Sequence, residues 1–449
     1  MKKVITYGSY DLLHHGHIRL LERAKALGDF LIVGVTSENY DKNRGKLNVS
    51  QSLIERIDAV RDTGLADMII IEEYEGQKID DILKYKANVF AIGSDWKGKF
   101  DYLGEYCEVV YLERTKGISS TQVRGEKHGI INLGIIGTGR IANRFVPESK
   151  FVSGVNVNSV YNPTISLAQS FAETHELNFF TNNLQEFLKR VDVVYIASPH
   201  KSHADYIKTC FNHTKHVLCE KPMVLSAKEA ADLYEIADKK NLVLMEGLKT
   251  TYAPAFNQLI ALVKSGVIGQ IKDIQASFTK LTSGPTRELN TSEAGGSVTE
   301  LASYPLLPII RILGNDYDDI RFYSFFKNGV DVFTRGIIHY RSAVASFKVG
   351  LGVKTEGDLV ISGTKGYAYV PAPWWKTEYF ELRFEDLNMT KKHFSRFEGD
   401  GLRYEINEFL SLIKNPEKSL HSKLIGKESV EIIKIIETFL NYTNVHYIH

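Results

Sequence analysis

The chain has 449 residues, which is longer than one ordinary domain and predicts two or three domains. Charged residues make up 24% and hydrophobic residues 43%, which excludes long disorder, collagen and coiled coil as descriptions of the whole chain. Lys and Arg total 55 against 54 Asp and Glu, so the net charge of +1 provides no global field for holding nucleic acid, and we expect no such partner.

The first residues, Met1 to Gly8, have the pattern of a strand and lack the longer apolar stretch of a signal peptide. The apolar run from Leu306 to Leu313 is interrupted by Pro308 and Arg311 and is too short to span a bilayer. The three cysteines, Cys107, Cys210 and Cys219, form no CxxC pair and fit a reducing compartment. We therefore expect a cytoplasmic protein with no membrane insertion and no metal site built from its side chains.

Two stretches of the chain begin like α/β domains, with a short apolar strand that leads through glycine into a helix. The first is Lys3–Gly8 with a helix over about His17–Leu27, and the second is Ile130–Gly137 with a helix from about Arg140. Further strands are predicted at 30–35, 68–71, 89–92 and 109–111 in the first unit, and at 155–161, 191–197, 216–219 and 242–246 in the second. Strands that alternate with helices in this way indicate parallel sheets.

After about Thr250 the pattern changes to strands with few helices between them, predicted at 271–280, 319–326, 332–340, 343–349 and 368–370, with a last helix at 427–440. This arrangement favours an antiparallel α+β lobe. The predicted fold is therefore α/β, with domains at 1–127, 128–249 and 250–449. The first two are α/β domains with parallel sheets, and the third is the α+β lobe.

The segment after the first strand contains an HxGH pattern, His14 to His17, at a strand-to-helix turn. A helix N-terminus offers free backbone N–H groups, and Gly16 lets the backbone approach a phosphate closely. His14 and His17 can donate hydrogen bonds to a nucleoside triphosphate as charge develops at its α-phosphorus. The residues that lead into this turn are predicted to bind the same nucleotide: Tyr7, Gly8, Ser9, Tyr10 and Asp11.

A second cluster near the end of the first domain combines a cation, a glycine and several hydroxyl groups before a short predicted helix, a combination that suits phosphate recognition. Alone it would be better explained as a solvated loop, but the HxGH pattern favours the functional interpretation. Its predicted nucleotide-site residues are Arg114, Thr115, Gly117, Ile118, Ser119, Ser120 and Thr121.

These motifs, together with the segments Leu20–Lys25, Gly98–Asp101 and Cys107–Leu112, resemble the glycerol-3-phosphate cytidylyltransferases of the HxGH nucleotidyltransferase superfamily. The resemblance covers residues 1 to about 124. It implies that CTP and a polyol phosphate give a CDP-polyol and pyrophosphate with Mg²⁺. It also implies that Lys46 and Arg114 stabilise the transition state and that Asp95 and Trp96 belong to the site. Gly64 stands where an arginine is expected, which leaves acceptor recognition open.

The second domain opens with Gly137-Thr138-Gly139-Arg140-Ile141-Ala142, a GxGxxA pattern between a strand and a helix. The first glycine permits the tight turn, the second lets a pyrophosphate approach the backbone, and Ala142 allows close helix packing. At the end of the next strand, where NAD enzymes often have an acidic residue, the chain has Asn162. NAD and NADP therefore both remain open as the cofactor.

Two further segments follow predicted strands and should lie at the same edge of the sheet. The first contributes Ser198, Pro199, His200 and His203 to the predicted cofactor site. The second contributes Glu220 to the same cofactor site, followed by Lys221 and Pro222. Glu220 and Lys221 could be a surface ion pair. At a strand end inside a dinucleotide domain, a catalytic role is the better interpretation.

Residues 130 to 449 resemble the glucose–fructose oxidoreductase/inositol dehydrogenase (Gfo/Idh/MocA) family through Glu220-Lys221-Pro222 and the segment Gly295 to Pro305. The resemblance implies that Lys221 orients the substrate and assists proton transfer, and that Tyr304 is the proton donor or acceptor. Glu300 stands in a position more often held by Asp and is expected to bind substrate. Thr251 replaces a frequent arginine, and Lys249 nearby is the expected substrate ligand.

The motifs and resemblances identify residues 1–127 as a Rossmann-like nucleotidyltransferase domain, 128–249 as a Rossmann dinucleotide-binding domain and 250–449 as an α+β substrate-binding lobe. Together they predict a bifunctional enzyme that makes a CDP-activated polyol for teichoic-acid-like or capsular polymers. Its oxidoreductase half would reduce a keto or aldehydo sugar phosphate to a polyol phosphate, and its transferase half would activate the product with CTP. One alternative is a glycerol-3-phosphate cytidylyltransferase whose second half is a regulatory or assembly module. Another is a nucleotide-sensing scaffold, which the presence of His14, His17 and Lys221 disfavours. We expect small-molecule substrates and a homo-oligomer.

Overall fold

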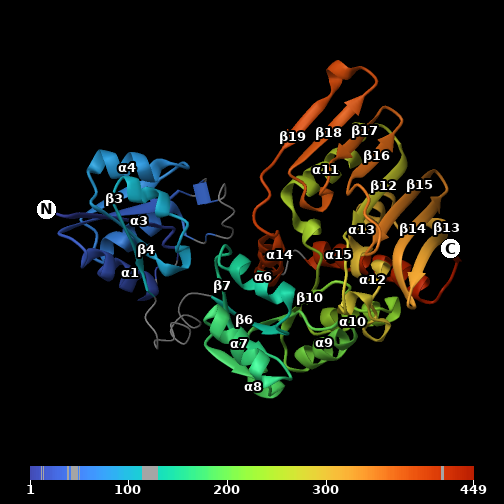
Figure 1. Cartoon of the computed structure of the whole chain (residues 1–449), viewed down its shortest axis with the longest axis horizontal. Coiled ribbons are helices and arrows are strands. Elements are labelled where there is room, and N and C mark those ends of the chain that lie inside the picture. The colour runs from blue at the N-terminus through green and yellow to red at the C-terminus, as the bar shows by residue number, and fades with distance from the viewer. Residues whose placement is uncertain are drawn as a thin grey trace. The chain divides into compact units, whose positions relative to one another are not determined.

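The computed structural model describes residues 1–11, 13, 15–37, 40–41, 49, 51–113, 130–415 and 419–448. Its contacts divide the chain into two compact units, Met1–Asn132 with Ser149–Asn158, and Leu133–Glu148 with Ser159–His449. Figure 1 colours the chain from blue at the N-terminus to red at the C-terminus and labels the elements of both units.

The first unit is built on a parallel sheet of five strands in the order β3-β2-β1-β4-β5. The strands are β1 (Lys3–Gly8), β2 (Phe30–Thr36), β3 (Met68–Glu72), β4 (Val89–Gly93) and β5 (Glu108–Leu112). The helices are α1 (His15–Lys25), α3 (Leu53–Asp62) and α4 (Gln77–Tyr85), with short 3-10 helices η1 (Ser94–Trp96) and η2 (Asp101–Glu105).

Successive strand residues of this sheet belong to different cores. Val4 packs with residues of α1 and α3, whereas Ile5 packs with Ile82 of α4 and with Leu103 of η2. Because side chains alternate across a strand, the sheet is covered on both faces, as the apolar strand sequences predict.

The dinucleotide part of the second unit is a six-stranded sheet in the order β11-β10-β9-β6-β7-β8. The strands are β6 (Ile131–Ile136), β7 (Val155–Tyr161), β8 (Phe179–Thr181), β9 (Val193–Ile196), β10 (His216–Glu220) and β11 (Leu244–Gly247). The helices are α6 (Arg140–Ser149), α7 (Ile165–His175), α8 (Leu184–Leu188), α9 (His203–Asn212) and α10 (Ala227–Lys239), with η3 at His200–Ser202. The strand order reverses between β6 and β9, which is the switch point where such sheets bind ligands.

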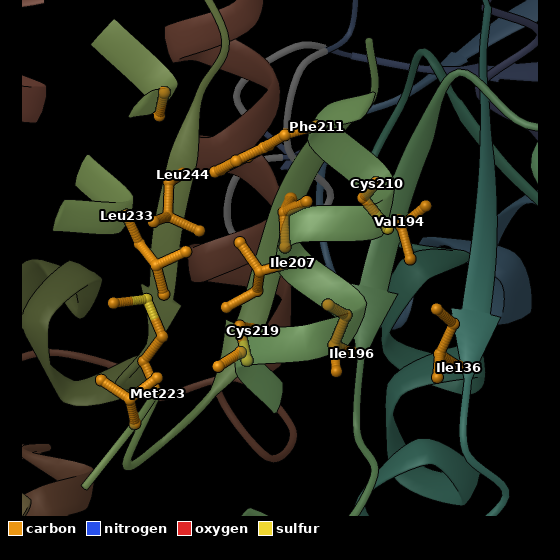
Figure 2. Close-up of a cluster of buried hydrophobic side chains, with 14 of the residues drawn as sticks. Ile136, Val194, Ile196, Ile207, Cys210, Phe211, Cys219, Met223, Leu233 and Leu244 are labelled. Carbon is orange, nitrogen blue, oxygen red and sulfur yellow. The ribbon is translucent and has the colours of Figure 1, made fainter. Parts of the chain in front are cut away.

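Figure 2 shows one core of this part, in which α9 packs on the sheet through Ile207 and Phe211. The same cluster contains Val194 of β9, Leu233 of α10 and Leu244 of β11, and Phe211 points toward Leu244. The packed helices hold the strand ends in fixed positions, and the candidate site residues follow those strand ends.

The C-terminal lobe is a nine-stranded sheet in the order β19-β18-β17-β16-β12-β15-β14-β13-β20. Its strands are β12 (Ile271–Thr279), β13 (Tyr317–Lys327), β14 (Val330–Tyr340), β15 (Ala343–Gly350), β16 (Leu359–Gly363), β17 (Gly366–Val370), β18 (Tyr379–Phe384), β19 (Lys391–Phe394) and β20 (Val445–Tyr447). Its helices are α11 (Pro254–Lys264), α12 (Ser297–Leu301), α13 (Ser303–Leu313), α14 (Leu402–Lys414) and α15 (Ser419–Leu440). Short 3-10 helices lie at η4 (Lys249–Tyr252), η5 (Arg287–Leu289), η6 (Thr291–Glu293), η7 (Trp374–Lys376) and η8 (Leu387–Met389).

The fold class predicted from the sequence is confirmed, with one refinement in the lobe. Most strand pairs of its sheet are antiparallel, but β12 pairs with β15, and β13 with β20, in parallel. Parallel strands need a long crossover connection, and the chain between β12 and β15 supplies one that contains α12, α13, β13 and β14. The lobe sheet is therefore mixed.

The last helix is longer than predicted, because it begins at Ser419 rather than near Lys427. The apolar run from Leu306 to Leu313 lies in helix α13, most of which is buried. In the part of the chain that the structure describes, no helix is both long and apolar enough to cross a membrane.

Candidate active sites

The first candidate site is the turn between β1 and α1. Tyr10 adopts a left-handed backbone conformation (φ 50°), and its ring meets the His17 ring edge-on at a centroid distance of 5.5 Å. Asp11 accepts a hydrogen bond from the backbone N–H of Gln51 at 2.9 Å. The turn is therefore tied to the segment that precedes α3, and His17 lies in the first turn of α1 beside it.

Arg56, for which the sequence predicted no role, holds this turn in place. Its side chain is fully buried on α3, and Nη1 donates to the carbonyl oxygens of Ser9 at 2.8 Å and Thr36 at 2.9 Å. A buried guanidinium that bonds to two strand-end carbonyls holds the β1 and β2 ends together. The only signal in the sequence was an arginine on the inner face of an amphipathic helix.

Other predicted nucleotide residues lie near the same sheet edge. Asp95 and Trp96 form η1 directly after β4, which is the neighbour of β1. Tyr7 is buried, and its hydroxyl donates to Asp81 of α4 at 2.9 Å, so its side chain is engaged with that helix. Burial and the Asp81 charge raise the pKa of Tyr7.

Several predicted transferase residues lie outside the described residues, and their roles remain predictions. They are His14, Lys46, Arg114, Thr115, Gly117, Ile118, Ser119, Ser120 and Thr121.

The second candidate site begins at the turn between β6 and α6. Gly137 has φ +102°, and a Cβ there would lie 2.6 Å from the carbonyl oxygen of Ala197. A Cβ at Gly139 would meet nothing within 4 Å, so the space above this residue is open. Because α6 begins at the next residue, Arg140, the turn fits a pyrophosphate that binds at a helix N-terminus.

Asn162, at the end of β7, braces this turn. Its Nδ2 donates to Thr138 Oγ1 at 2.9 Å, and its Oδ1 accepts from the backbone N–H of Thr164 at 2.9 Å. The predicted cofactor residues Thr138 and Asn162 are thus in direct contact, and Ile141 follows them in the first turn of α6.

Lys221 and Tyr304, the predicted catalytic pair of the oxidoreductase, come together from different elements. Lys221 follows β10, and its Nζ donates to the backbone oxygen of Glu300 at 2.7 Å and lies 5.8 Å from the centroid of the Tyr304 ring. Tyr304 is buried on α13. Burial, together with the charges of Glu220 and Glu405, raises the pKa of Tyr304, so its hydroxyl keeps its proton at neutral pH.

The carboxylate of Glu300 is already engaged. Its Oε1 lies 3.0 Å from His200 Nε2 and 3.0 Å from Arg287 Nη1. Burial alone would raise the pKa of Glu300, but the hydrogen bond with His200 and the charges of Lys221 and Arg287 outweigh it and hold the pKa at about 2. Glu300 therefore meets Lys221 through its backbone oxygen, whereas its side chain meets His200 and Arg287.

His203 connects the two strand-end segments. Its Nε2 lies 2.8 Å from the carbonyl oxygen of Ser198 and its Nδ1 lies 3.1 Å from that of Met223. Burial lowers the pKa of His203 to about 4, so the ring is neutral at physiological pH. Ser198 is also bonded through its hydroxyl to Ser202, and Pro199 is exposed at the sheet edge.

A cluster of charged residues lies close to the catalytic pair. Glu220 Oε1 accepts from the Tyr195 hydroxyl at 2.6 Å, and Lys249 Nζ donates to the carbonyl oxygen of Asp400 at 2.6 Å. Glu405, in the first turn of α14, is fully buried, and neither of its carboxylate oxygens has a hydrogen-bond partner among the described residues. Burial and the Glu220 charge raise the pKa of Glu405.

Glu405 and Arg287 were not predicted from the sequence. Glu405 lies between Tyr404 and Ile406 in α14, a helix that the sequence pattern did not predict. Among the described residues, no group of three or more His, Cys, Asp or Glu side chains could hold a metal ion.

Two family models match the two halves of the chain. Residues 5–126 match the cytidylyltransferase-like family, and residues 131–248 match the oxidoreductase family with an NAD-binding Rossmann fold. The glycerol-3-phosphate cytidylyltransferase of Bacillus spizizenii is 50% identical over 129 residues, which are 28% of this chain and 95% of that protein.

For the second half, the scyllo-inositol 2-dehydrogenase (NADP(+)) IolU of Bacillus subtilis is 28% identical over 304 residues, which are 66% of this chain and 91% of that protein. Among solved structures, the 3-ketoreductase KijD10 from Actinomadura kijaniata, in complex with NADP and TDP-benzene, superposes with a TM-score of 0.63 at 19% identity. That comparison covers 71% of this chain and 100% of KijD10, and it shows a shared fold.

The fold and the comparisons define a nucleotidyltransferase fused to an NAD(P)-dependent oxidoreductase. The N-terminal part belongs to the glycerol-3-phosphate cytidylyltransferase family, and the C-terminal part is a Gfo/Idh/MocA oxidoreductase domain. Both resemblances inferred from the sequence motifs are confirmed.

Proposed function

We propose that the chain reduces a keto or aldehydo sugar phosphate to a polyol phosphate with NAD(P)H and then converts that product with CTP into a CDP-polyol and pyrophosphate. A bacterial teichoic-acid-like or capsular polymer is the proposed destination of the CDP-polyol. The observation that carries the proposal is the meeting of Lys221 and Tyr304 in the same chain as a cytidylyltransferase domain.

In the reduction, a bound nicotinamide supplies the hydride that adds to the carbonyl carbon. The Lys221 ammonium uses one N–H for the Glu300 backbone oxygen and has others for the substrate oxygen. Tyr304 stays protonated at neutral pH and can give the proton that completes the hydroxyl group. Hydride at carbon and proton at oxygen together account for the conversion of a carbonyl into an alcohol.

The residues of the reductase site also support the choice of substrate. Lys249 is buried beside the cluster that contains Glu220 and Glu405, and burial lowers the pKa of Lys249. Ammonium and carboxylate groups hydrogen-bond to hydroxyl groups, and a sugar phosphate carries a hydroxyl on most of its carbon atoms. The relative IolU is named for an inositol, which is itself a polyol.

In the transfer, a phosphate oxygen of the polyol phosphate attacks the α-phosphorus of CTP, and pyrophosphate leaves. His17, in the first turn of α1, is the described residue proposed to donate to the developing charge, with Gly8 to Asp11 as the nucleotide cradle. Mg²⁺ is proposed to accompany CTP, as is usual for triphosphate chemistry. Glycerol 3-phosphate is the acceptor of the curated relative, and ribitol 5-phosphate is the second candidate here.

NAD and NADP remain alternative cofactors, because Asn162 provides neither an acid for the ribose hydroxyls nor a cation for a 2′-phosphate. A homo-oligomer and a cytoplasmic location are further parts of the proposal that derive from the sequence. The competing function is a glycerol-3-phosphate cytidylyltransferase with a regulatory second half. The 50% identity of the N-terminal domain to a glycerol-3-phosphate cytidylyltransferase supports the transferase part of this alternative.

One experiment separates the two functions. The full chain is incubated with CTP, Mg²⁺, NADPH or NADH and a panel of ketose and aldose phosphates, and cofactor oxidation and CDP-polyol mass are both followed. We expect oxidation that depends on one carbonyl substrate and a matching amount of CDP-polyol. A CDP-polyol formed only from preformed glycerol 3-phosphate, with no carbonyl-dependent oxidation in any mixture, would favour the regulatory alternative.

A further inference from the structure

The segment Arg287–Glu293 leaves the substrate lobe and bonds to the dinucleotide sheet. It comprises η5 and η6 and lies between β12 and α12. Glu288 is the central contact, since its Oε1 accepts from Arg140 Nη2 at 3.0 Å, and Arg140 opens the helix after the pyrophosphate turn. Glu288 is 10% exposed in its side chain, and Lys280 Nζ lies 3.4 Å from the same oxygen.

A second contact joins the same segment to the next strand end. Lys201, in η3 after β9, donates through Nζ to the carbonyl oxygen of Ser292. A third contact runs through Arg287, which pairs with the Glu300 carboxylate that also bonds to His200 of η3.

These contacts lie on both sides of the switch point of the sheet. Arg140 follows β6 and Lys201 follows β9, and β6 and β9 are the neighbouring strands between which the strand order reverses. Ligands of doubly wound sheets bind in the crevice at this point, outside the carboxyl ends of the strands. A segment tied to both strand ends crosses the place where a dinucleotide lies.

The lobe does not need this segment to stay attached to the dinucleotide domain. Arg403 of α14 is buried and bonds to Glu148 of α6 through Nη2 and Oε1 at 2.7 Å, and Lys221 bonds to α12. The Arg140–Glu288 pair is different, because Arg140 is 69% exposed and lies at the start of α6, next to the pyrophosphate turn. Solvent screens an ion pair that has one exposed partner, so the pair contributes little to global stability and another role is the better explanation.

We propose that Arg287–Glu293 is a strap over the dinucleotide site and that Glu288 is a residue that retains the dinucleotide. A bound dinucleotide lies beneath the strap and leaves when the Arg140–Glu288 pair and the Lys201–Ser292 bond open. The inference requires dinucleotide binding by this half of the chain, but it does not require the coupled reaction proposed above.

The test measures the rate at which NADPH leaves the full chain. Excess NADP displaces the bound NADPH in a stopped-flow instrument, and the change in NADPH fluorescence gives the release rate. Glu288→Gln removes the charge and keeps the size of the side chain, and we expect release to become about fivefold faster, the range of one exposed ion pair. Rising salt should speed release from the unmodified chain toward the variant's rate, because salt screens exposed pairs.

The matched control is Glu229→Gln, which removes the exposed Lys208–Glu229 pair (2.8 Å) on the helices α9 and α10 of the same domain. It should release NADPH at the unmodified rate. Lys201→Met is the second strap variant and should also speed release. Unchanged release in both strap variants, or an equal change in the control, would overturn the strap. The assay contains neither a sugar phosphate nor CTP. The NADPH release rates can therefore be interpreted even if the coupled reaction does not occur.

Discussion

Lys221 is the residue on which the reductase proposal depends most directly. Its hydrogen-bond partner is a backbone carbonyl of α12, which fixes the ammonium without neutralising it. Lys221→Ala should lower carbonyl reduction by about two to four orders of magnitude, because the group that polarises the carbonyl and shares proton movement is lost. Dinucleotide affinity should stay similar, since Gly137 and Gly139 form the pyrophosphate turn. Steady-state reduction and NADPH titration measure the two effects.

Lys221→Arg tests the same idea with the charge retained. A planar guanidinium that stays protonated cannot exchange the proton, so we expect at most partial recovery. The internal control is CDP-polyol synthesis from a preformed polyol phosphate, which should be unchanged in both variants. Near-normal reduction by the alanine variant would limit Lys221 to a structural role through its hydrogen bond to the Glu300 backbone oxygen.

His203 makes a prediction about pH. Burial lowers the pKa of His203 from 6.5 to about 4. Between these two pH values the unfolded chain therefore binds a proton that the folded chain does not bind. The contribution of this group to stability is therefore complete above pH 6.5 and is lost as the pH falls to about 4. Its size is on the order of 3 kcal/mol in the free energy of unfolding.

The measurement is urea unfolding of the full chain and of His203→Gln across that pH window. Burial also lowers the pKa of His200 and His216, so part of the slope should persist in the variant. We expect a shallower loss of stability in acid for His203→Gln. Equal slopes for the two proteins would show that His203 does not titrate as inferred.

At the scale of elements, the N-terminus of the short helix α12 is capped by a residue of strand β14. Asp331 of β14 accepts through Oδ2 from the backbone N–H of Val298 at 2.9 Å and from the hydroxyls of Ser297 and Thr334. Burial raises the pKa of Asp331 to about 6. This cap holds the helix that carries Glu300, and the Glu300 carbonyl in turn positions Lys221.

Asp331→Ala should cost about 1–3 kcal/mol of stability, because it leaves buried donors without an acceptor. Reduction should fall about tenfold as Lys221 loses its fixed partner, a modest loss for a misplaced proton-transfer group. Asp331→Asn keeps one acceptor oxygen and should recover part of both losses. Thermal unfolding and steady-state reduction are the measurements, and unchanged reduction in a destabilised alanine variant would limit Asp331 to a structural role.

The β6–α6 turn gives a sharper prediction for dinucleotide binding. Gly137→Ala would place a methyl group 2.6 Å from the Ala197 oxygen at φ +102°, where side chains are strained. We expect the turn to shift and NADPH affinity to fall by about tenfold or more, in line with a strain of 1–3 kcal/mol. A Cβ at Gly139 would meet no atom within 4 Å, so Gly139→Ala should destabilise the protein less than Gly137→Ala does. Equal stability losses for the two variants would contradict the geometric reading of Gly137.

Comparison of these elements with the sequence shows what periodicity can and cannot predict. Strand ends were predictable because apolar runs end at Gly8, Gly137 and Glu220, and the motif residues follow directly. Contacts between distant segments were not, since Arg140 and Glu288 are 148 residues apart and neither is unusual locally. The burial of Glu405 and the parallel pairing of β12 with β15 were also not predictable, because both depend on how distant segments of the lobe come together.

At the scale of the whole molecule, the two proposed reactions use residues of two separate compact units. His17 belongs to the first unit, whereas Lys221 and Tyr304 belong to the second. Each unit has its own parallel sheet and its own cores, so a change in one site need not disturb the other fold.

His17→Ala tests this independence. Loss of a donor aimed at developing phosphate charge should slow cytidylyl transfer by about a hundredfold or more. Carbonyl reduction should be unchanged, so the polyol phosphate should accumulate when the variant receives sugar phosphate, NADPH and CTP together. Mass spectrometry of the mixture over time distinguishes this accumulation from a general loss of activity. If both activities fell equally in a variant that still unfolds at the normal temperature, the assignment of one reaction to each unit would be wrong, because a single donor would then serve both.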